Sequence, residues 1–290
     1  MTRRWVHLAV AGATLAVLVW RLGAGPFIDG LRSVDGWALA AASGLAVLTT
    51  VCCAWRWRIV ARGLGVDLPL GPAVAAYYRS LFLNVTLPGG VVGDVHRGFS
   101  HGRDTSDVGR GLRAVAWERS AGQMVQIVLT VAVLLILPSP VRSVMPVVVL
   151  ALIVAAGVVA LGVRAWPSLD PPPVRAWPAI ALASALIVAG HTATFLIAAR
   201  SAGVTAPLSQ ILPLALLVML AAALPNVGGW GPREGVTAWA FADAGLGASL
   251  GVATAVVYGV MVLVASLPGA AVLVAAQLRV PVHLRGVQDV

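Results

Sequence analysis

The sequence has no lysine, only two glutamates and only two cysteines among its 290 residues. Charged residues make up 11% of the chain, whereas soluble globular domains carry about 25%. The adjacent Cys52 and Cys53 cannot make a disulfide framework or a four-ligand zinc site. No long polar stretch is present, which excludes a sizeable soluble catalytic domain, and no nucleotide-binding loop is found.

Apolar residues and arginine are what the chain has in excess. Hydrophobic residues make up 59% of the chain, which excludes disorder, and 20 arginines against 11 acids give a net charge of +9. The arginines are scattered between long apolar runs and form no basic stripe, so nucleic acid is not an expected partner. These features predict an integral membrane protein.

Six apolar runs are long enough to cross a bilayer, which takes about 20 mostly apolar residues. The first resembles a signal peptide but has no clear small-x-small cleavage site, so we interpret it as a retained span. The runs are Val6–Leu22, Trp37–Ala54, Leu112–Leu137, Val144–Val163, Ala179–Ala199 and Ser249–Gln277. Two more, Leu70–Leu87 and Ile211–Leu224, end in Pro/Gly-rich breaks that suit re-entrant segments. The predicted fold is therefore all-α, with about six full spans and two re-entrant, broken helices.

The distribution of arginine indicates the orientation, because cytoplasmic loops carry the excess of positive charge. With the N-terminus inside, thirteen arginines face the cytoplasm and four the outside; Arg56 and Arg97 are among the thirteen. If both broken segments crossed the membrane completely, the arginine cluster from Arg97 to Arg113 would lie on the outer side, against the bias of positive charge toward the cytoplasm. We expect one polytopic domain over 1–290 in the cell membrane, with both termini cytoplasmic and halves of about 1–165 and 175–285. A proline-rich cytoplasmic linker, Asp170–Pro173, joins the halves.

The two broken segments form a weak repeat. Leu87–Arg97 and Leu224–Glu234 each contain Leu-Pro, then three glycines, then an acid and an arginine. A helix that restarts beyond such a break points unpaired N–H groups at the gap, which favours phosphate. Paired breaks of this kind indicate a transporter site between inverted repeats, whereas the alternative is two tight interhelical loops.

Charges also occur within the apolar segments. Arg119, Gln123, Gln126 and Thr130 share one helical face, which we expect to line a cavity; the alternative is that Glu118 and Arg119 snorkel to the cytoplasmic interface. Each glutamate of the protein adjoins an arginine, as Glu118–Arg119 and Arg233–Glu234. A cross-half exchange that pairs Glu118 with Arg233 and Arg119 with Glu234 is one hypothesis.

Histidines give weaker signals. His96 and His101 crowd one expected cytoplasmic loop with three aspartates, Asp94, Asp104 and Asp107, but their spacing matches no zinc pattern. We therefore expect no metal and no cofactor. His191 lies inside a span, where a helix-packing hydrogen bond is favoured over a proton relay or a headgroup contact.

Three ordered motifs give a family resemblance. Asn84-Val-Thr-Leu-Pro-Gly-Gly-Val-Val-Gly-Asp-Val-His-Arg97, Glu118-Arg-Ser-Ala-Gly122 and Leu224-Pro-Asn-Val-Gly-Gly-Trp-Gly-Pro-Arg-Glu234 resemble the lysylphosphatidylglycerol synthase transmembrane family. Val92 and Trp230 depart from the family's pattern in detail. The resemblance implies a flippase-like membrane domain that moves aminoacylated or other anionic lipids between leaflets. The chain ends shortly after its last apolar run, so we do not expect it to synthesise lysyl-lipid by itself.

The expected function is thus a lipid translocase that moves an anionic or modified phospholipid (aminoacyl, glyco or polyprenyl) and is not itself an enzyme. A membrane-embedded transferase and a non-catalytic partner in lipid or cell-envelope synthesis are the alternatives. Expected partners are a membrane lipid, with a homodimer and a partner enzyme left open. The expected substrate-binding residues are Asn84, Pro88, Gly89, Gly90, Gly93, Asp94, Arg97, Glu118, Arg119, Gln123, Pro225, Asn226, Gly228, Gly229, Gly231, Arg233 and Glu234.

Overall fold

The computed structural model describes residues 19–137, 172–224, 226–227 and 229–278, with residues 146, 150, 153, 154 and 157. This part of the chain forms helices joined by short connections. They are α2 (Gly25–Arg32), α3 (Gly36–Gly63), α4 (Leu70–Thr86), α5 (Val92–Asp104), α6 (Val108–Ile136), η2 (Val174–Ala176), α8 (Trp177–Ser201), α9 (Leu208–Ala221), α10 (Pro232–Asp243) and α11 (Ala248–Leu278).

Four helical segments of the described part are long and apolar enough to cross a membrane. They are Gly36–Gly63, Val108–Ile136, Val174–Ser201 and Ala248–Ala276. The prediction of an all-α, multi-pass membrane protein is confirmed, and these segments match four of the six expected spans. The other two, Val6–Leu22 and Val144–Val163, lie largely outside the described residues, as does half of the proline-rich linker.

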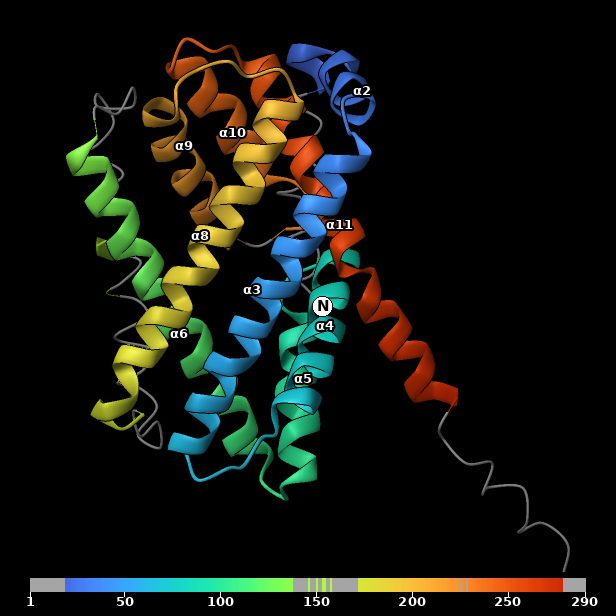
Figure 1. Ribbon diagram of the computed structural model, residues 1–290, viewed down its shortest axis with the longest axis vertical. Helices are drawn as coiled ribbons and strands as arrows, with labels where there is room; N and C mark the ends of the chain where they lie inside the picture. Colours follow the sequence, from blue (N-terminus) through green and yellow to red (C-terminus); the bar gives the residue numbers. More distant parts are fainter. Residues whose placement is uncertain are drawn as a thin grey trace, which may run out of the picture.

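The long helices frame two shorter helix pairs at opposite ends of the molecule. In Figure 1, α4 and α5 occupy the lower part and α9 and α10 the upper part, beside α3, α6, α8 and α11. The breaks of the two pairs meet: the Gly89 N–H donates to the Asn226 carbonyl at 2.9 Å, and Pro88 forms an antiparallel bridge with Val227. The two segments that repeat in sequence are therefore in direct contact.

Local sequence explains why the helices break there. Leu87 ends α4 in an extended conformation, as expected for a residue that precedes proline. Gly90 has a φ of 66°, and a Cβ on it would lie 2.7 Å from the Asn226 side chain. Gly231 precedes α10 with a φ of 120°. Glycine is needed at both points, because a side chain would strain the backbone or separate the two breaks.

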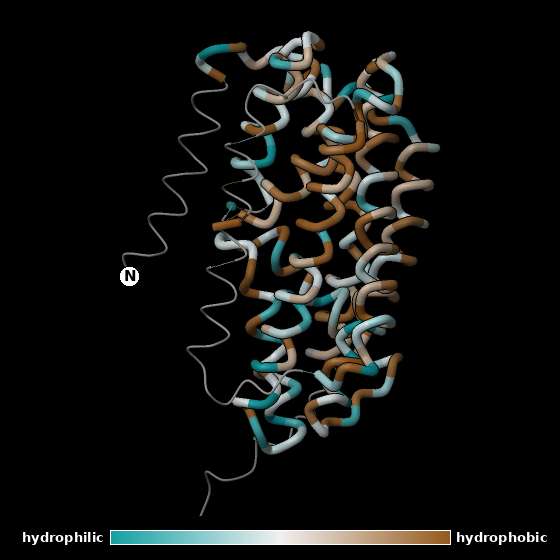
Figure 2. Tube along the Cα trace, turned by 90° about the vertical axis from the view of Figure 1, so that its left-hand side faces the viewer, coloured by the Kyte–Doolittle hydropathy of each residue, from teal (hydrophilic) through white to brown (hydrophobic). Residues whose placement is uncertain are grey.

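Small residues let the helices approach closely. Gly111 of α6 packs on the backbone of Gly98 and Gly102 of α5, and Gly190 of α8 packs on Thr49 of α3. Such contacts are typical of helix packing in membranes, where close van der Waals contact replaces the hydrophobic effect. Figure 2 shows apolar trace along most of the helices, with hydrophilic segments at both ends.

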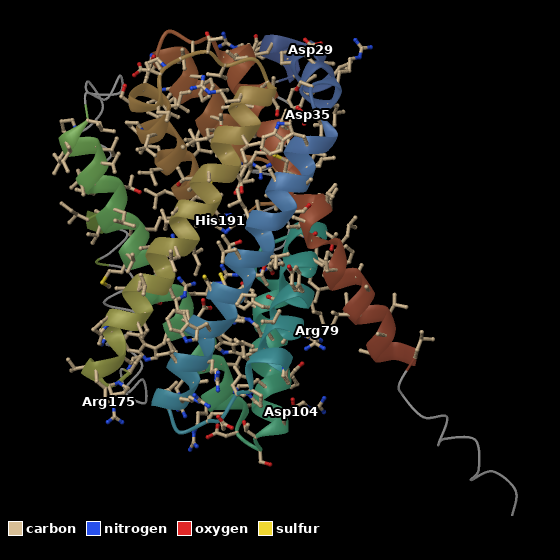
Figure 3. All side chains as sticks on the ribbon, in the orientation of Figure 1. Asp29, Asp35, Arg79, Asp104, Arg175 and His191 are labelled. Carbon is tan, nitrogen blue, oxygen red and sulfur yellow. The ribbon has the colours of Figure 1, made fainter. Side chains whose placement is uncertain are left out.

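Two elements differ from the sequence prediction. The expected cytoplasmic loop with His96 and His101 is the helix α5, in which Asp94 and His101 are buried. Its glycines and polar residues hid the helix from sequence analysis, because Asp94, Arg97 and His101 are buried against other helices, as are its glycines. The short helix α2 was not predicted either; in Figure 1 it lies at the upper end, where Asp29 and Asp35 are found in Figure 3.

Candidate functional site

Five charged side chains from three helices, four of them buried, form a network beside the first break. Glu118 of α6 is completely buried, and its Oε1 accepts hydrogen bonds from Arg56 Nε at 2.9 Å and Tyr77 Oη at 3.2 Å. Its Oε2 accepts from Arg97 Nη2 at 3.1 Å. One glutamate thus pairs with arginines from both α3 and α5.

Asp94 is the second acid of this network. It accepts hydrogen bonds from Ser80 Oγ at 3.1 Å, Asn84 Nδ2 at 3.0 Å and Arg97 Nη2 at 2.9 Å, and it forms an ion pair with Arg119. The network contains three arginines and two acids, so its formal charge is +1.

Arg97 is held by aromatic rings as well as by acids. Its guanidinium carbon lies 4.4 Å from the centroid of the Trp57 ring and 4.2 Å from that of Tyr77. Its Nε and Nη1 have no hydrogen-bond partner among the described residues, and the side chain is fully buried. Stacking on ring faces stabilises a cation electrostatically where water is excluded. From the sequence, Arg56 and Arg97 were predicted to face the cytoplasm. In the structure both are buried, because the acids of the network pair with them.

The glycines beside these charges serve close packing. A Cβ on Gly122 would collide with the Arg56 guanidinium, and one on Gly93 would collide with the Ser80 backbone. Gly122 therefore opens α6 to Arg56, and Gly93 brings Asp94 within reach of Ser80 and Asn84. This explains why glycine stands near the charges in both motifs of the first half.

The second break carries a smaller charge pair. Arg233 donates from Nε to Glu234 Oε1 at 3.0 Å, and Glu234 Oε2 accepts from the Gly231 N–H at 2.6 Å. The Arg233 guanidinium carbon lies 5.2 Å from the Tyr258 ring centroid. The hypothesis of a cross-half exchange is wrong, because each acid finds an arginine within its own half.

Several glycine N–H groups at the breaks already have acceptors, contrary to the expectation that they are open. The Gly93 N–H donates to Asn84 Oδ1 at 2.8 Å, and the Gly229 N–H donates to Asn226 Oδ1 at 2.9 Å. The Gly231 N–H donates to the Glu234 carboxylate. Side-chain oxygens cap these donors in the way that helix N-termini are commonly capped. These three N–H groups are therefore not free to bind an anion.

A cavity of about 260 Å³ lies between the two halves. Three arginines line it, Arg56, Arg119 and Arg233, and no carboxylate of the described residues does. The side chain of Arg119 is 45% exposed, the highest value in the network. Amide and imidazole groups complete the polar wall: Asn84, Gln123, Gln126, His191 and Asn226. The acids lie behind the arginines, so the cavity presents positive charge.

The predicted site residues divide into two sets. Those that line the cavity are Asn84, Gly90, Arg119, Gln123, Asn226, Gly229 and Arg233. Those that hold its framework are Pro88, Gly89, Gly93, Asp94, Arg97, Glu118, Gly231 and Glu234. Pro225 and Gly228 lie outside the described residues. The polar face predicted on α6 does point inward, since Gln123 and Gln126 line the cavity and Thr130 is buried.

Sequence reasoning missed four polar cavity residues that come from other helices. Arg56 was counted as a loop charge, and Tyr77, Ser184 and Tyr258 carry no motif. The only available signal was the presence of polar side chains inside apolar runs. His191 lies at mid-height between α8 and α3 in Figure 3, and its Nδ1 is 3.4 Å from Tyr258 Oη. Among the described residues, no three metal-ligating side chains gather.

The fold and the cavity define a class before any comparison is made: a multi-pass membrane protein with two broken helix pairs that meet at an arginine-lined cavity. Residues 4–171, more than half of the chain, match the family described as Lysylphosphatidylglycerol synthase TM region. The chain belongs to this family, which confirms the resemblance seen in the motifs. The family connects it with lipid and cell-envelope biosynthesis or lipid translocation. No curated protein matches the chain.

Proposed function

We propose that this protein moves an anionic phospholipid, plain or modified on its headgroup, between the leaflets of the cell membrane. One observation carries the proposal: within the part of the chain that the structure describes, the cavity between the two broken helix pairs is lined by three arginines and by no carboxylate. Phosphate is the common group of such lipids. Arginine is the residue best suited to it, because its planar donors match two phosphate oxygens at once.

The charge of the site fits a phosphodiester. The network around Glu118 has a formal charge of +1, and Arg233 with Glu234 adds none. A phosphodiester with one negative charge would therefore neutralise the cavity. Electrostatic attraction is strong there, because the bilayer and the buried helices lower the local dielectric constant. The side-chain amides of Gln123 and Asn226 would then form hydrogen bonds with polar groups of the lipid headgroup.

The arrangement of the halves supports a route across the membrane. The two helix pairs lie at opposite ends and touch at their breaks. In the proposal they are re-entrant segments of an inverted repeat, and movement of one half against the other exposes the cavity to each leaflet in turn. The end of the bundle with Asp104 and Arg175 (Figure 3) would face the cytoplasm, in line with the arginine bias.

The proposal is tested in vesicles that contain the purified protein and phosphatidylglycerol with a labelled headgroup, by measuring the label in each leaflet. We expect protein-dependent movement without any donor, and a loss of at least tenfold in Arg233→Gln and in Arg119→Gln. Arg62→Gln is the matched control, since Arg62 is exposed and pairs only with Asp67; it should stay within twofold. Activity that is retained in both cavity variants would contradict the proposal. Formation of a product from an added lipid-linked donor would indicate a membrane-embedded transferase. If the protein neither moves the lipid nor forms such a product, the result would indicate a non-catalytic partner.

A further inference from the structure

A second, smaller cavity of about 60 Å³ adjoins the first. It lies among α3, α4, α8 and α11, and we call it the apolar chamber. Its walls include Ala42, Ala46, Met261 and Ala265. Five residues line both cavities: Cys53, Leu81, Val85, His191 and Val262. The arginine-lined cavity and the apolar chamber are therefore neighbouring compartments.

The chamber wall is mostly apolar, and three of the four hydroxyl groups that line it bond within their own helices. Thr49 Oγ1 donates to the Ala46 carbonyl at 3.1 Å, Thr194 Oγ1 to that of Gly190 at 3.0 Å, and Ser266 Oγ to that of Leu263 at 2.7 Å. Hydroxyls that are satisfied by their own helix offer little to water. Among residues 19–137, 172–224, 226–227 and 229–278, no arginine or acid lines the chamber. A small cavity with such walls favours an apolar guest over water.

The chamber lies next to the outer surface between α3 and α11. Ala46 of α3 and Ala265 of α11 are small side chains of its wall. Their neighbours along the two helices, Val47 and Leu267, are 52% and 50% exposed. In Figure 1, α11 passes close to α3 in the upper part and then diverges from the bundle. The chamber thus lies on the inner side of two helices, α3 and α11, whose outer sides face lipid.

We infer that a segment of one acyl chain of the transported phospholipid occupies the apolar chamber while its phosphate lies in the arginine-lined cavity. This inference rests on the proposed function and adds that the lipid reaches the site between α3 and α11. The inference is supported by the five residues that the two cavities share. It is also supported by the difference between their walls, because arginines attract the phosphate of the headgroup and apolar side chains favour the acyl chain. His191 stands at the junction, with its imidazole near Tyr258. A soluble anion would use the polar cavity alone.

The test distinguishes the contribution of the lipid's acyl chain to binding from that of its headgroup. We would measure the binding of dioleoyl-phosphatidylglycerol and of glycerophosphoglycerol, its water-soluble headgroup, to the purified full-length chain in detergent. In Ala46→Leu, which fills the chamber, lipid affinity should fall at least fivefold while headgroup affinity stays within twofold. Val47→Leu, one residue along and facing outward, should leave both within twofold. Ala265→Leu fills the chamber from the opposite wall and replaces Ala46→Leu if that variant does not elute as a single species.

The outcomes distinguish the two proposals. Lipid affinity that is unchanged in both chamber variants, or headgroup affinity that falls as far as lipid affinity, would overturn the acyl-chain site. A wild-type protein that binds the lipid with this selectivity but does not move it in vesicles would overturn translocation alone. If Arg233→Gln abolishes movement while Ala46→Leu moves lipid like the wild type, only the inference about the chain fails.

Discussion

The two breaks carry the same sequence pattern but are stabilised in different ways. At the first, Asp94 and Glu118 hold arginines from three helices and receive bonds from Tyr77, Ser80 and Asn84. At the second, Arg233 and Glu234 pair with each other, and Glu234 also caps Gly231. A repeated motif therefore does not imply a repeated environment.

The difference indicates a division of roles. The first break is a rigid framework in which the removal of one acid leaves several partners without compensation. The second depends on one pair, and its Arg233 faces the cavity between aromatic rings, 5.6 Å from the Trp230 centroid. We expect substitutions at the first break to reduce stability more, and those at the second to affect ligand binding more than stability.

The largest contrast should come from the two glutamates. Glu118→Gln breaks the bridges to Arg56 and Arg97 in a fully buried place, so it should lower the free energy of unfolding by about 3–5 kcal/mol. Glu234→Gln breaks one bridge and should cost about 1–2 kcal/mol. Unfolding in mixed detergent and SDS measures both. An equal or larger loss in Glu234→Gln would refute the division of roles.

A smaller effect is expected from Gly122→Ala. The added methyl group would displace the Arg56 guanidinium from Glu118, and overpacking of this kind costs about 1–3 kcal/mol. Gly109→Ala, in the same helix but with only ordinary contact to Asp107, should be neutral or slightly stabilising, because alanine favours helix. Melting temperatures in detergent compare the two variants. Equal melting temperatures for the two variants would show that the close contact between Gly122 and Arg56 does not contribute to stability.

The smallest contrast is between the asparagines at the two breaks. Asn84→Ala loses the bond to the Gly93 N–H and the one to Asp94, and should cost about 1–2 kcal/mol. Asn226→Ala loses the bonds to the Gly229 N–H and the Leu224 carbonyl at a more exposed place, so we expect less than about 1 kcal/mol. Hydrogen exchange of residues 87–93 and 224–231 reports local opening. A break at Asn226 that opens more than the one at Asn84 would reverse the comparison.

Much of the framework could be read from the sequence. Long apolar runs predicted the helices that match α3, α6, α8 and α11, and Leu-Pro followed by glycines predicted both breaks. Their contact through Gly89 and Asn226 could only be guessed from the repeat. The pairing partners were missed, because adjacent residues such as Glu118 and Arg119 point in different directions on a helix and reach different neighbours.

By itself, the sequence determined that this is a helical membrane protein with two broken segments, because apolar run length and proline act locally along the chain. Only the tertiary structure decided which acid each arginine meets and which of the paired arginines also face the cavity. Arg56 lies far from Glu118 in the sequence, yet it pairs with it, and Gly122 permits the approach. Burial in a low dielectric makes each such pairing strong, and the choice of partner depends on helix packing that no local pattern encodes.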